Sequence, residues 1–457
     1  MRYLPLTPHD RAEMLSAIGV DSVDAFYQNV PEAARRKELL DLPLHQGEIE
    51  VEKALSSMAA KNHPAANGPF FLGAGCYFHH VPATVDHIIQ RSEFLTSYTP
   101  YQPEISQGTL MAVFQFQTMI ANLTGMDIAN ASMYDGATAT AEAVLMARRI
   151  TSRPNIHIHG ALHPEYREVI ETYIRNYPEM KVTSGAPDGN SSCVIVQTPD
   201  FHGVPQQLEA LRKECSESGA LLIVVVTEIL SLGLLPPPSL ADIVVGEAQS
   251  IGVGMSFGGP HLGFFACRKD FLRQMPGRLC GETVDRDGRR GYVLTLSTRE
   301  QHIRREKATS NICTNQGLFA LAFTIHMSLL GEIGFKQLAR LNHERACMLA
   351  DRLSKVKNLQ VSGAPFFNEF VVELPVSAKE TVDKLAARGI IAGLPLEGGK
   401  LLVAATEMTS EQDIEIFAGA LEEMINPVGR ASGSTGTQTN NQGDPAQSLP
   451  RLAGFKA

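Results

Sequence analysis

A loop at residues 97–108 carries the polar side chains best suited to chemistry. Two prolines and a glycine in this segment prevent regular strand pairing, while phenol, amide and carboxyl groups remain free to contact a ligand. We therefore predict ligand-contacting roles for four residues, with Ser106 and Gln107 beside them. The four are Tyr98, Tyr101, Gln102 and Glu104. The alternative is a rigid, aromatic-lined surface loop that binds nothing.

A second candidate site lies at residues 130–139, between two helical patterns. The Asp-Gly step allows a tight turn into a helix that begins near Ala137, so backbone N–H groups and the helix dipole meet there. Such a junction favours an anion or a phosphate group. The predicted cup, which we interpret as vestigial, is formed by Ser132, Asp135, Gly136 and Thr138. An Asp-Gly turn with nothing bound is the alternative.

The end of the buried strand at 241–247 lacks an amine. Ser250 follows that strand at the place where a lysine could hold an aldehyde group covalently, and a serine cannot do so. Lys269 and Lys307 do not end buried strands, and we expect both to be surface charges.

Other polar residues also follow predicted strands. Glu228 comes directly after the apolar strand at 221–226, and His163 follows the strand at 155–158. A carboxylate at a strand end can pair with a cofactor nitrogen, although a glutamate is one methylene longer than the usual aspartate. We interpret His163 mainly as a local capping or hydrogen-bonding residue.

Short β-branched runs alternate with helical segments between about residues 69 and 316. Continuous apolar strands that alternate with helices predict a mostly parallel sheet covered on both faces. The strands expected are 155–158, 193–196, 221–226 and 243–245. Apolar residues from Leu110 to Ala121 also share one helical face that ends near Gly125.

We predict four regions along the chain. Residues 1–65 form a helical N-terminal arm that includes a helix capped by Thr7, and residues 66–330 form a large α/β domain. Residues 331–426 form a smaller α/β domain whose last helix opens with a capping box from Thr409 to Gln412. Residues 427–457 are rich in Gly, Ser, Thr, Asn and Gln, which predicts a disordered tail.

Composition limits the possible functions. The chain has 457 residues, is 44% hydrophobic and carries a formal net charge of -9, which predicts a globular protein that does not bind nucleic acid. We expect no signal peptide or membrane span and a cytoplasmic location. Seven cysteines without C-x-x-C pairing favour reduced thiols over disulfides or a metal site.

Five segments resemble one family, the glycine dehydrogenase (decarboxylating) or P-protein family of the glycine cleavage system, and in particular its N-terminal half. They are Met-Arg-Tyr-Leu-Pro at 1–5, Phe-Leu-Gly-Ala-Gly at 71–75, Thr-Pro-Tyr-Gln-Pro-Glu at 99–104, Ser-Phe-Gly-Gly-Pro at 256–260 and Arg-Glu-Lys-Ala-Thr-Ser-Asn-Ile-Cys-Thr at 305–314. The resemblance covers nearly the whole chain and implies a fold-type-I, pyridoxal-phosphate (PLP) transferase-like large domain.

The resemblance also implies a division of labour between two subunits. Subunit 2 would hold PLP covalently, and this chain would complete the partner's active site in an α2β2 assembly. The pair would decarboxylate glycine and transfer the aminomethyl group to the lipoyl group of the H-protein. Possible contacts across the interface to the partner's PLP are Ser310, Asn311, Thr314 and Asn315.

Two other functions stay open from the sequence. The chain could be an independent homodimeric PLP-dependent lyase or decarboxylase that uses an unexpected lysine. It could also be a non-catalytic scaffold for subunit 2.

Overall fold

The computed structural model describes residues 6–36, 38, 40–95, 98–183 and 185–426. The expected disordered tail, 427–457, lies outside these residues, as does Ser97. The chain divides into two compact units, Met1–His63 and Pro64–Ala457.

The described residues of the first unit contain two α-helices, α1 (Pro8–Ile18) and α2 (Glu48–Ala59). Thr7 caps α1 as expected, in a capping box with Asp10, and Gly19 ends the helix with a φ of 83°. The amphipathic pattern that starts at Val51 lies in α2, but no residue of α2 is buried within this unit.

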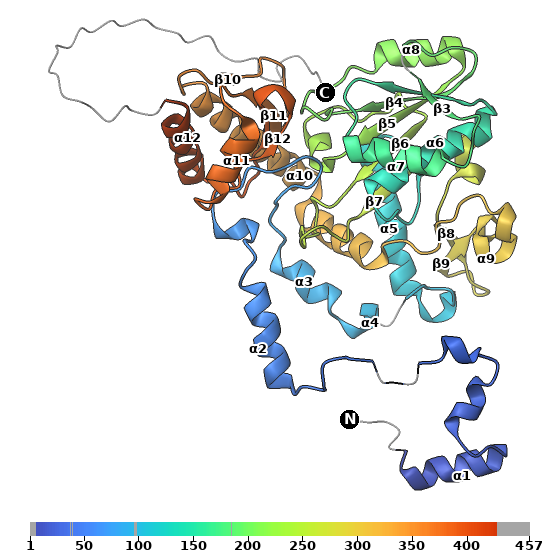
Figure 1. Cartoon of the computed structure of the whole chain (residues 1–457). Coiled ribbons are helices and arrows are strands. Elements are labelled where there is room, and N and C mark those ends of the chain that lie inside the picture. The colour runs from blue at the N-terminus through green and yellow to red at the C-terminus, as the bar shows by residue number, and fades with distance from the viewer. Residues whose placement is uncertain (1–5, 37, 39, 96–97, 184, 427–457) are drawn as a thin grey trace, which may run out of the picture. The chain divides into compact units, whose positions relative to one another are not determined.

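The second unit is built on a mostly parallel seven-stranded sheet, as predicted (Figure 1). Its strand order is β1-β7-β6-β5-β4-β2-β3, and β7 alone runs against the other six strands, because it pairs antiparallel with both β1 and β6. The strands are β1 (Ile128–Ala129), β2 (Asn155–His159), β3 (Lys181–Thr183), β4 (Ser191–Gln197), β5 (Leu221–Val226), β6 (Ile243–Glu247) and β7 (Gly263–Cys267). Every strand expected from an apolar run is present.

Helices cover both faces of this sheet. Val224 packs in a core cluster with α5 (Gln107–Thr124), α8 (Glu209–Ser218) and the first half of α10 (Gly317–Leu353). Its neighbour Val225 points to the opposite cluster, which α6 (Gly136–Thr151) and α7 (Pro164–Ile174) complete. This alternation is why the strands are apolar along their whole length.

A four-stranded antiparallel sheet lies nearer the C-terminus. Its order is β10-β11-β13-β12, and α11 (Ala378–Ala386), α12 (Glu411–Ile425) and the end of α10 complete its core. The strands are β10 (Gln360–Val361), β11 (Glu369–Glu373), β12 (Leu394–Pro395) and β13 (Lys400–Ala404). The capping box predicted at Thr409 was wrong by one residue, because Ser410 caps α12 and pairs with Asp413.

The remaining elements were not predicted in detail. A hairpin of β8 (Leu279–Val284) and β9 (Arg290–Thr295) packs on α5, and short helices α3 (Ala83–Ile89), α4 (Ser92–Leu95) and α9 (Gln301–Arg304) lie in the connections. Figure 1 shows this hairpin beside the end of α5.

Helix α10 is long and apolar enough to cross a membrane by length and composition alone. Its first half packs in the core through Ala320 and Phe323, and Gly331, with φ 60° and ψ -174°, breaks the helical backbone midway. The core helix of a globular protein passes the same test, so the helix by itself is weak evidence for a membrane span.

Candidate functional site

The carboxyl ends of β5 and β6 lie side by side, because the two strands are parallel with Val226 opposite Gly246. Glu228 therefore emerges next to Gln249 and Ser250, at the edge of the sheet where α/β enzymes bind their ligands. All three residues are buried. Neither Lys269 nor Lys307 replaces the missing amine beside Ser250, because both are exposed.

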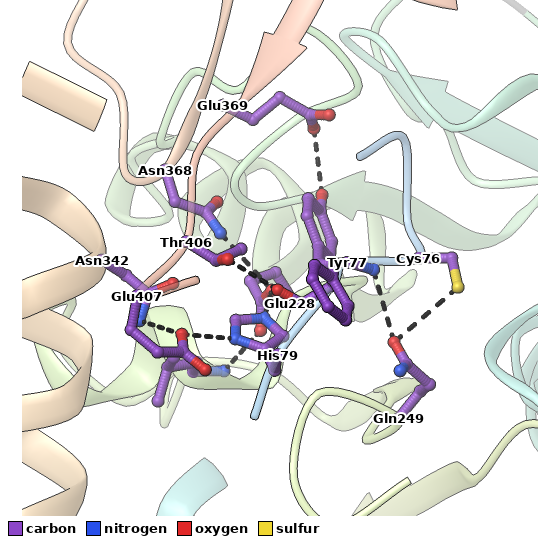
Figure 2. Close-up of polar contacts among 12 residues, drawn as sticks. Cys76, Tyr77, His79, Glu228, Gln249, Asn342, Asn368, Glu369, Thr406 and Glu407 are labelled. Atoms are coloured by element: carbon purple, nitrogen blue, oxygen red, sulfur yellow. Dashed lines mark hydrogen bonds and ion pairs between the residues drawn. The ribbon is translucent and has the colours of Figure 1, made fainter. Parts of the chain in front are cut away.

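A buried histidine joins two carboxylates at this edge (Figure 2). His79 Nε2 lies 3.1 Å from Glu228 Oε2, and His79 Nδ1 lies 2.9 Å from Glu407 Oε2. Only the imidazolium form donates from both nitrogens, so the geometry requires a cation. Burial disfavours the charge, but the two carboxylates outweigh it and raise the pKa of His79 to about 10.

Both carboxylates have further partners that fix their positions. Glu407, which follows β13, accepts hydrogen bonds from Asn342 Nδ2 at 2.9 Å and from the His80 backbone N–H at 2.7 Å. Glu228 Oε1 accepts from the Leu230 backbone N–H at 3.0 Å. Burial opposes ionisation of Glu407, but the contact with His79 prevails and lowers its pKa to about 2. The cluster thus connects the large sheet, α10 and the smaller sheet.

A second buried pair fills the space beside this cluster. Tyr77 donates its hydroxyl to Glu369 Oε2 at 2.9 Å, and the Ala74 backbone N–H donates to Glu369 Oε1 at 2.6 Å. Gln249 Oε1 accepts from the Tyr77 backbone N–H at 3.3 Å (Figure 2). Burial raises the pKa of Glu369 to about 7. The segment from Ala74 to His79 therefore occupies the edge of the sheet where a ligand would enter.

The predicted anion cup at the start of α6 is filled by the chain itself. Asp135 caps the helix by accepting from the Thr138 backbone N–H at 2.7 Å, and Ser132 Oγ accepts from the Gln316 backbone N–H at 3.0 Å. The Gly136 backbone N–H donates to Glu247 Oε2 at 3.1 Å. These three contacts use groups that the sequence analysis assigned to a phosphate.

PLP, the cofactor implied by the resemblance, does not fit this pocket. No amine stands at Ser250, Glu247 already accepts from the cup, and Glu228 is paired with His79. The cavity left between Tyr77, Glu228 and their neighbours has a volume of about 10 Å³, which is the space for one water. Among the described residues, no group of three or more His, Cys, Asp and Glu side chains is placed to hold a metal ion either.

Four side chains of the loop at 98–104 are exposed to solvent, whereas Thr99, Pro100 and Pro103 are half-buried. Tyr98 is 83% exposed and Tyr101 is 56% exposed, and both Gln102 and Glu104 are exposed. Gln107 instead has a structural role, because its amide donates to Pro103 O and Tyr292 O and accepts from the Tyr292 backbone N–H. Exposed aromatic and polar groups on a braced loop are suited to contacting a partner.

Arg278 holds Tyr101 in this loop. Arg278 Nη2 donates to the Tyr101 hydroxyl at 2.8 Å, and its guanidinium lies 5.2 Å from the centre of the Tyr101 ring. The same side chain is 4% exposed and pairs with Glu300 at 3.4 Å. A buried cation with a carboxylate partner is a rigid support, so Tyr101 is held in place although its ring is exposed.

The segment at 310–315 lies against the same loop. The Tyr98 hydroxyl is 3.2 Å from Thr314 Oγ1, and Asn315 Nδ2 donates to Ala131 O at 3.0 Å. Ser310 Oγ accepts from the Ile312 backbone N–H at 3.1 Å, and Asn311 is exposed. Tyr98, Arg278 and Asn315 line a cavity of about 70 Å³. Two groups of residues that were singled out separately therefore meet at one surface.

Several residues that define these sites were missed by sequence reasoning. They are His79, Glu247, Arg278, Glu369 and Glu407. The available signal was a charged residue where a buried strand begins or ends, as with Glu247 in Val-Val-Gly-Glu and Glu369 at the start of β11. His163 does cap α7, as interpreted: its Nδ1 accepts from the Glu165 backbone N–H at 3.2 Å, and its Nε2–H donates to Ala74 O at 2.9 Å.

Residues 1–421 match the family model described as glycine cleavage system P-protein. A protein of Parvibaculum lavamentivorans named probable glycine dehydrogenase (decarboxylating) subunit 1 is 58% identical over 449 residues, which is 93% of this chain and 100% of that protein.

Two solved structures have a fold similar to that of this chain. A crystal structure of glycine decarboxylase (P-protein) of the glycine cleavage system, in inhibitor-bound form, is 42% identical with a TM-score of 0.85, and the match covers 93% of this chain and 100% of that chain. A variant of C-DES with glycine covalently linked to its PLP cofactor is 14% identical with a TM-score of 0.55, covering 79% of this chain and 97% of that chain. The second likeness shows the fold alone.

Proposed function

The chain belongs to the glycine cleavage system P-protein family, and from this premise we propose that it completes the glycine-decarboxylating site of a partner, subunit 2. The observation that carries the proposal is the contrast between its two candidate sites. The edge of its own sheet is closed and has no lysine, whereas the loop at 98–104 and the segment at 310–315 present exposed polar groups on a braced surface.

Each part of that surface has a physical role in the proposal. PLP, bound to a lysine of subunit 2, supplies an electron sink for the loss of the carboxyl group. Four side chains of the loop form a wall that orients glycine and excludes water from the reacting groups: Tyr98, Tyr101, Gln102 and Glu104. Exclusion of water favours aminomethyl transfer over side reactions with water. Thr314 and Asn315, held by Tyr98 and Ala131, contact the phosphate end of the partner's site together with Ser310 and Asn311.

We propose an α2β2 assembly that passes the aminomethyl group to the lipoyl group of the H-protein in the cytoplasm. The names of the relatives support a second subunit, because they call this half subunit 1. A formal charge of -9 favours protein and small-molecule partners over nucleic acid.

The test is to co-express the chain with its candidate subunit 2 and to measure the mass of the complex and glycine–bicarbonate exchange. We expect a complex of two copies of each chain and exchange that requires this chain. Full exchange by subunit 2 alone would indicate that this chain is a non-catalytic scaffold. Exchange by this chain alone would favour an independent enzyme.

A further inference from the structure

Glu247 has an unusual environment for a carboxylate at the end of a strand. It is 4% exposed and accepts three backbone hydrogen bonds: Oε2 from Gly136, and Oε1 from Gln249 at 3.0 Å and Leu262 at 2.8 Å. All three partners are N–H donors, so the carboxylate form satisfies them and a protonated carboxyl would need an acceptor instead.

The position of Glu247 explains these contacts. Gly136 is the first residue of α6, a helix of 16 residues, so its N–H lies at the positive end of the helix dipole. A Cβ at Gly136 would approach the Tyr166 hydroxyl to 2.1 Å, which shows how closely the helix start packs. The buried carboxylate is thus the group that this helix terminus binds, in the cup that sequence analysis assigned to phosphate.

A second charged side chain stands at the other end of the pocket. His79 presents a cationic N–H to Glu228, as the protonated ring nitrogen of PLP does to a strand-end carboxylate in enzymes of this fold. One negative group of the chain therefore binds the helix start, and one positive group pairs with the strand-end carboxylate.

We propose that this chain closes its own pocket with these internal replacements, and that Glu247 occupies a latent site for a phosphate group. Removing its carboxylate frees the Gly136, Gln249 and Leu262 N–H groups, and backbone N–H groups at a helix start are the donors that bind phosphate. The proposal concerns the pocket of this chain and does not depend on the assembly with subunit 2.

The test is calorimetric titration of the full-length chain with inorganic phosphate at pH 8, in wild type and in Glu247→Ala. Glu165→Ala is the matched control, because Glu165 lies in the first turn of α7 and is exposed. We expect the Glu247→Ala chain to bind one phosphate roughly tenfold or more tightly than the other two chains do. Equal binding by all three chains, including no binding, overturns the proposal.

A second variant covers the case in which Glu247→Ala does not fold. Glu247→Gln keeps the volume but places an NH₂ group against N–H donors. At pH 8, above the pKa of about 7 that burial gives Glu247, we expect this variant to have a lower melting temperature than wild type and no rescue by phosphate. A Glu247→Gln chain that melts with wild type would overturn the proposal, because the charge would then be dispensable.

Discussion

The imidazolium of His79 and the carboxylate of Glu228 form an ion pair with 1% and 2% side-chain exposure and a separation of 3.1 Å. The pair lies at the carboxyl end of β5, where an enzyme of this fold would present a carboxylate to its cofactor. Glu228 is therefore already neutralised from within the chain. The closed pocket at this edge thus contrasts with the exposed surface at Tyr98.

Replacing His79 by Ala should strongly destabilise the chain. The change leaves Glu228 and Glu407 as buried carboxylates without their cation, and loss of one partner of a buried pair costs about 3–5 kcal/mol. Chemical denaturation measures the free energy of unfolding. In the control, Arg167→Ala breaks the exposed pair with Glu171 and should cost about 0.5 kcal/mol. A similar small loss of unfolding free energy in both variants would show that the buried ion pairs of His79 do not stabilise the fold.

The same cluster predicts how stability depends on pH. The pKa of His79 is raised from 6.5 to about 10, so its contribution is fully present below about pH 6.5 and is lost as pH rises through about 10. The pKa of Glu407 is lowered from 4.5 to about 2, so its contribution is present above about pH 4.5 and is lost as pH falls toward 2.

Two buried carboxyls outside this cluster act in the opposite direction. Burial raises the pKa of Glu247 and Glu369 to about 7, so the stability that these groups contribute decreases as pH rises from about 4.5 to 7.

Denaturation midpoints from pH 6.5 to 10 test the His79 part of this dependence. Wild type should lose stability across the range, and His79→Gln should lose less, because Gln does not titrate. Parallel curves for the two chains would assign the pH dependence to other groups.

Changes in the loop should affect turnover more than assembly. In the reconstituted pair, Tyr98→Phe removes the hydroxyl near Thr314, and Gln102→Ala removes an exposed amide. We expect each change to lower glycine–bicarbonate exchange roughly 10- to 100-fold, because small displacements of an orienting group are costly. The mass of the complex should stay the same, and Tyr177→Phe is the control at another exposed tyrosine. Wild-type exchange in both loop variants would remove the loop from the mechanism.

Restoring an amine at the end of β6 should not restore cofactor binding. In Ser250→Lys, Glu247 still fills the cup and Tyr77 and His79 still occupy the space beside Glu228. We expect no pyridoxyl adduct after incubation of this variant with PLP and reduction with borohydride, as measured by mass spectrometry. A stoichiometric adduct on residue 250 would mean that the pocket opens readily.

The sequence predicts those features whose signals are local. Runs such as Leu221–Val226 are apolar throughout and rich in β-branched residues, which identifies a strand buried on both faces. The β8–β9 hairpin was missed because polar residues fill Glu282 to Arg290 and weaken the alternation. The exposed loop at Tyr98 was singled out from its prolines and polar groups.

The buried cluster could not be predicted in the same way. His79 and Glu407 are 328 positions apart in the chain, and nothing in the residues around either one identifies its partner. The same holds for Gly136 and Glu247, which are 111 positions apart. The second pairing follows from the packing of β6 against α6, and the first from the bridge that sets Phe70 beside Ile391 near the smaller sheet.

Borohydride reduction of the reconstituted pair, followed by mass measurement of each chain, tests the central claim most directly. The account predicts a pyridoxyl group on subunit 2 and an unchanged mass for this chain, both in the complex and when it is purified alone with added PLP. A pyridoxyl group bonded to any side chain of this polypeptide would contradict it.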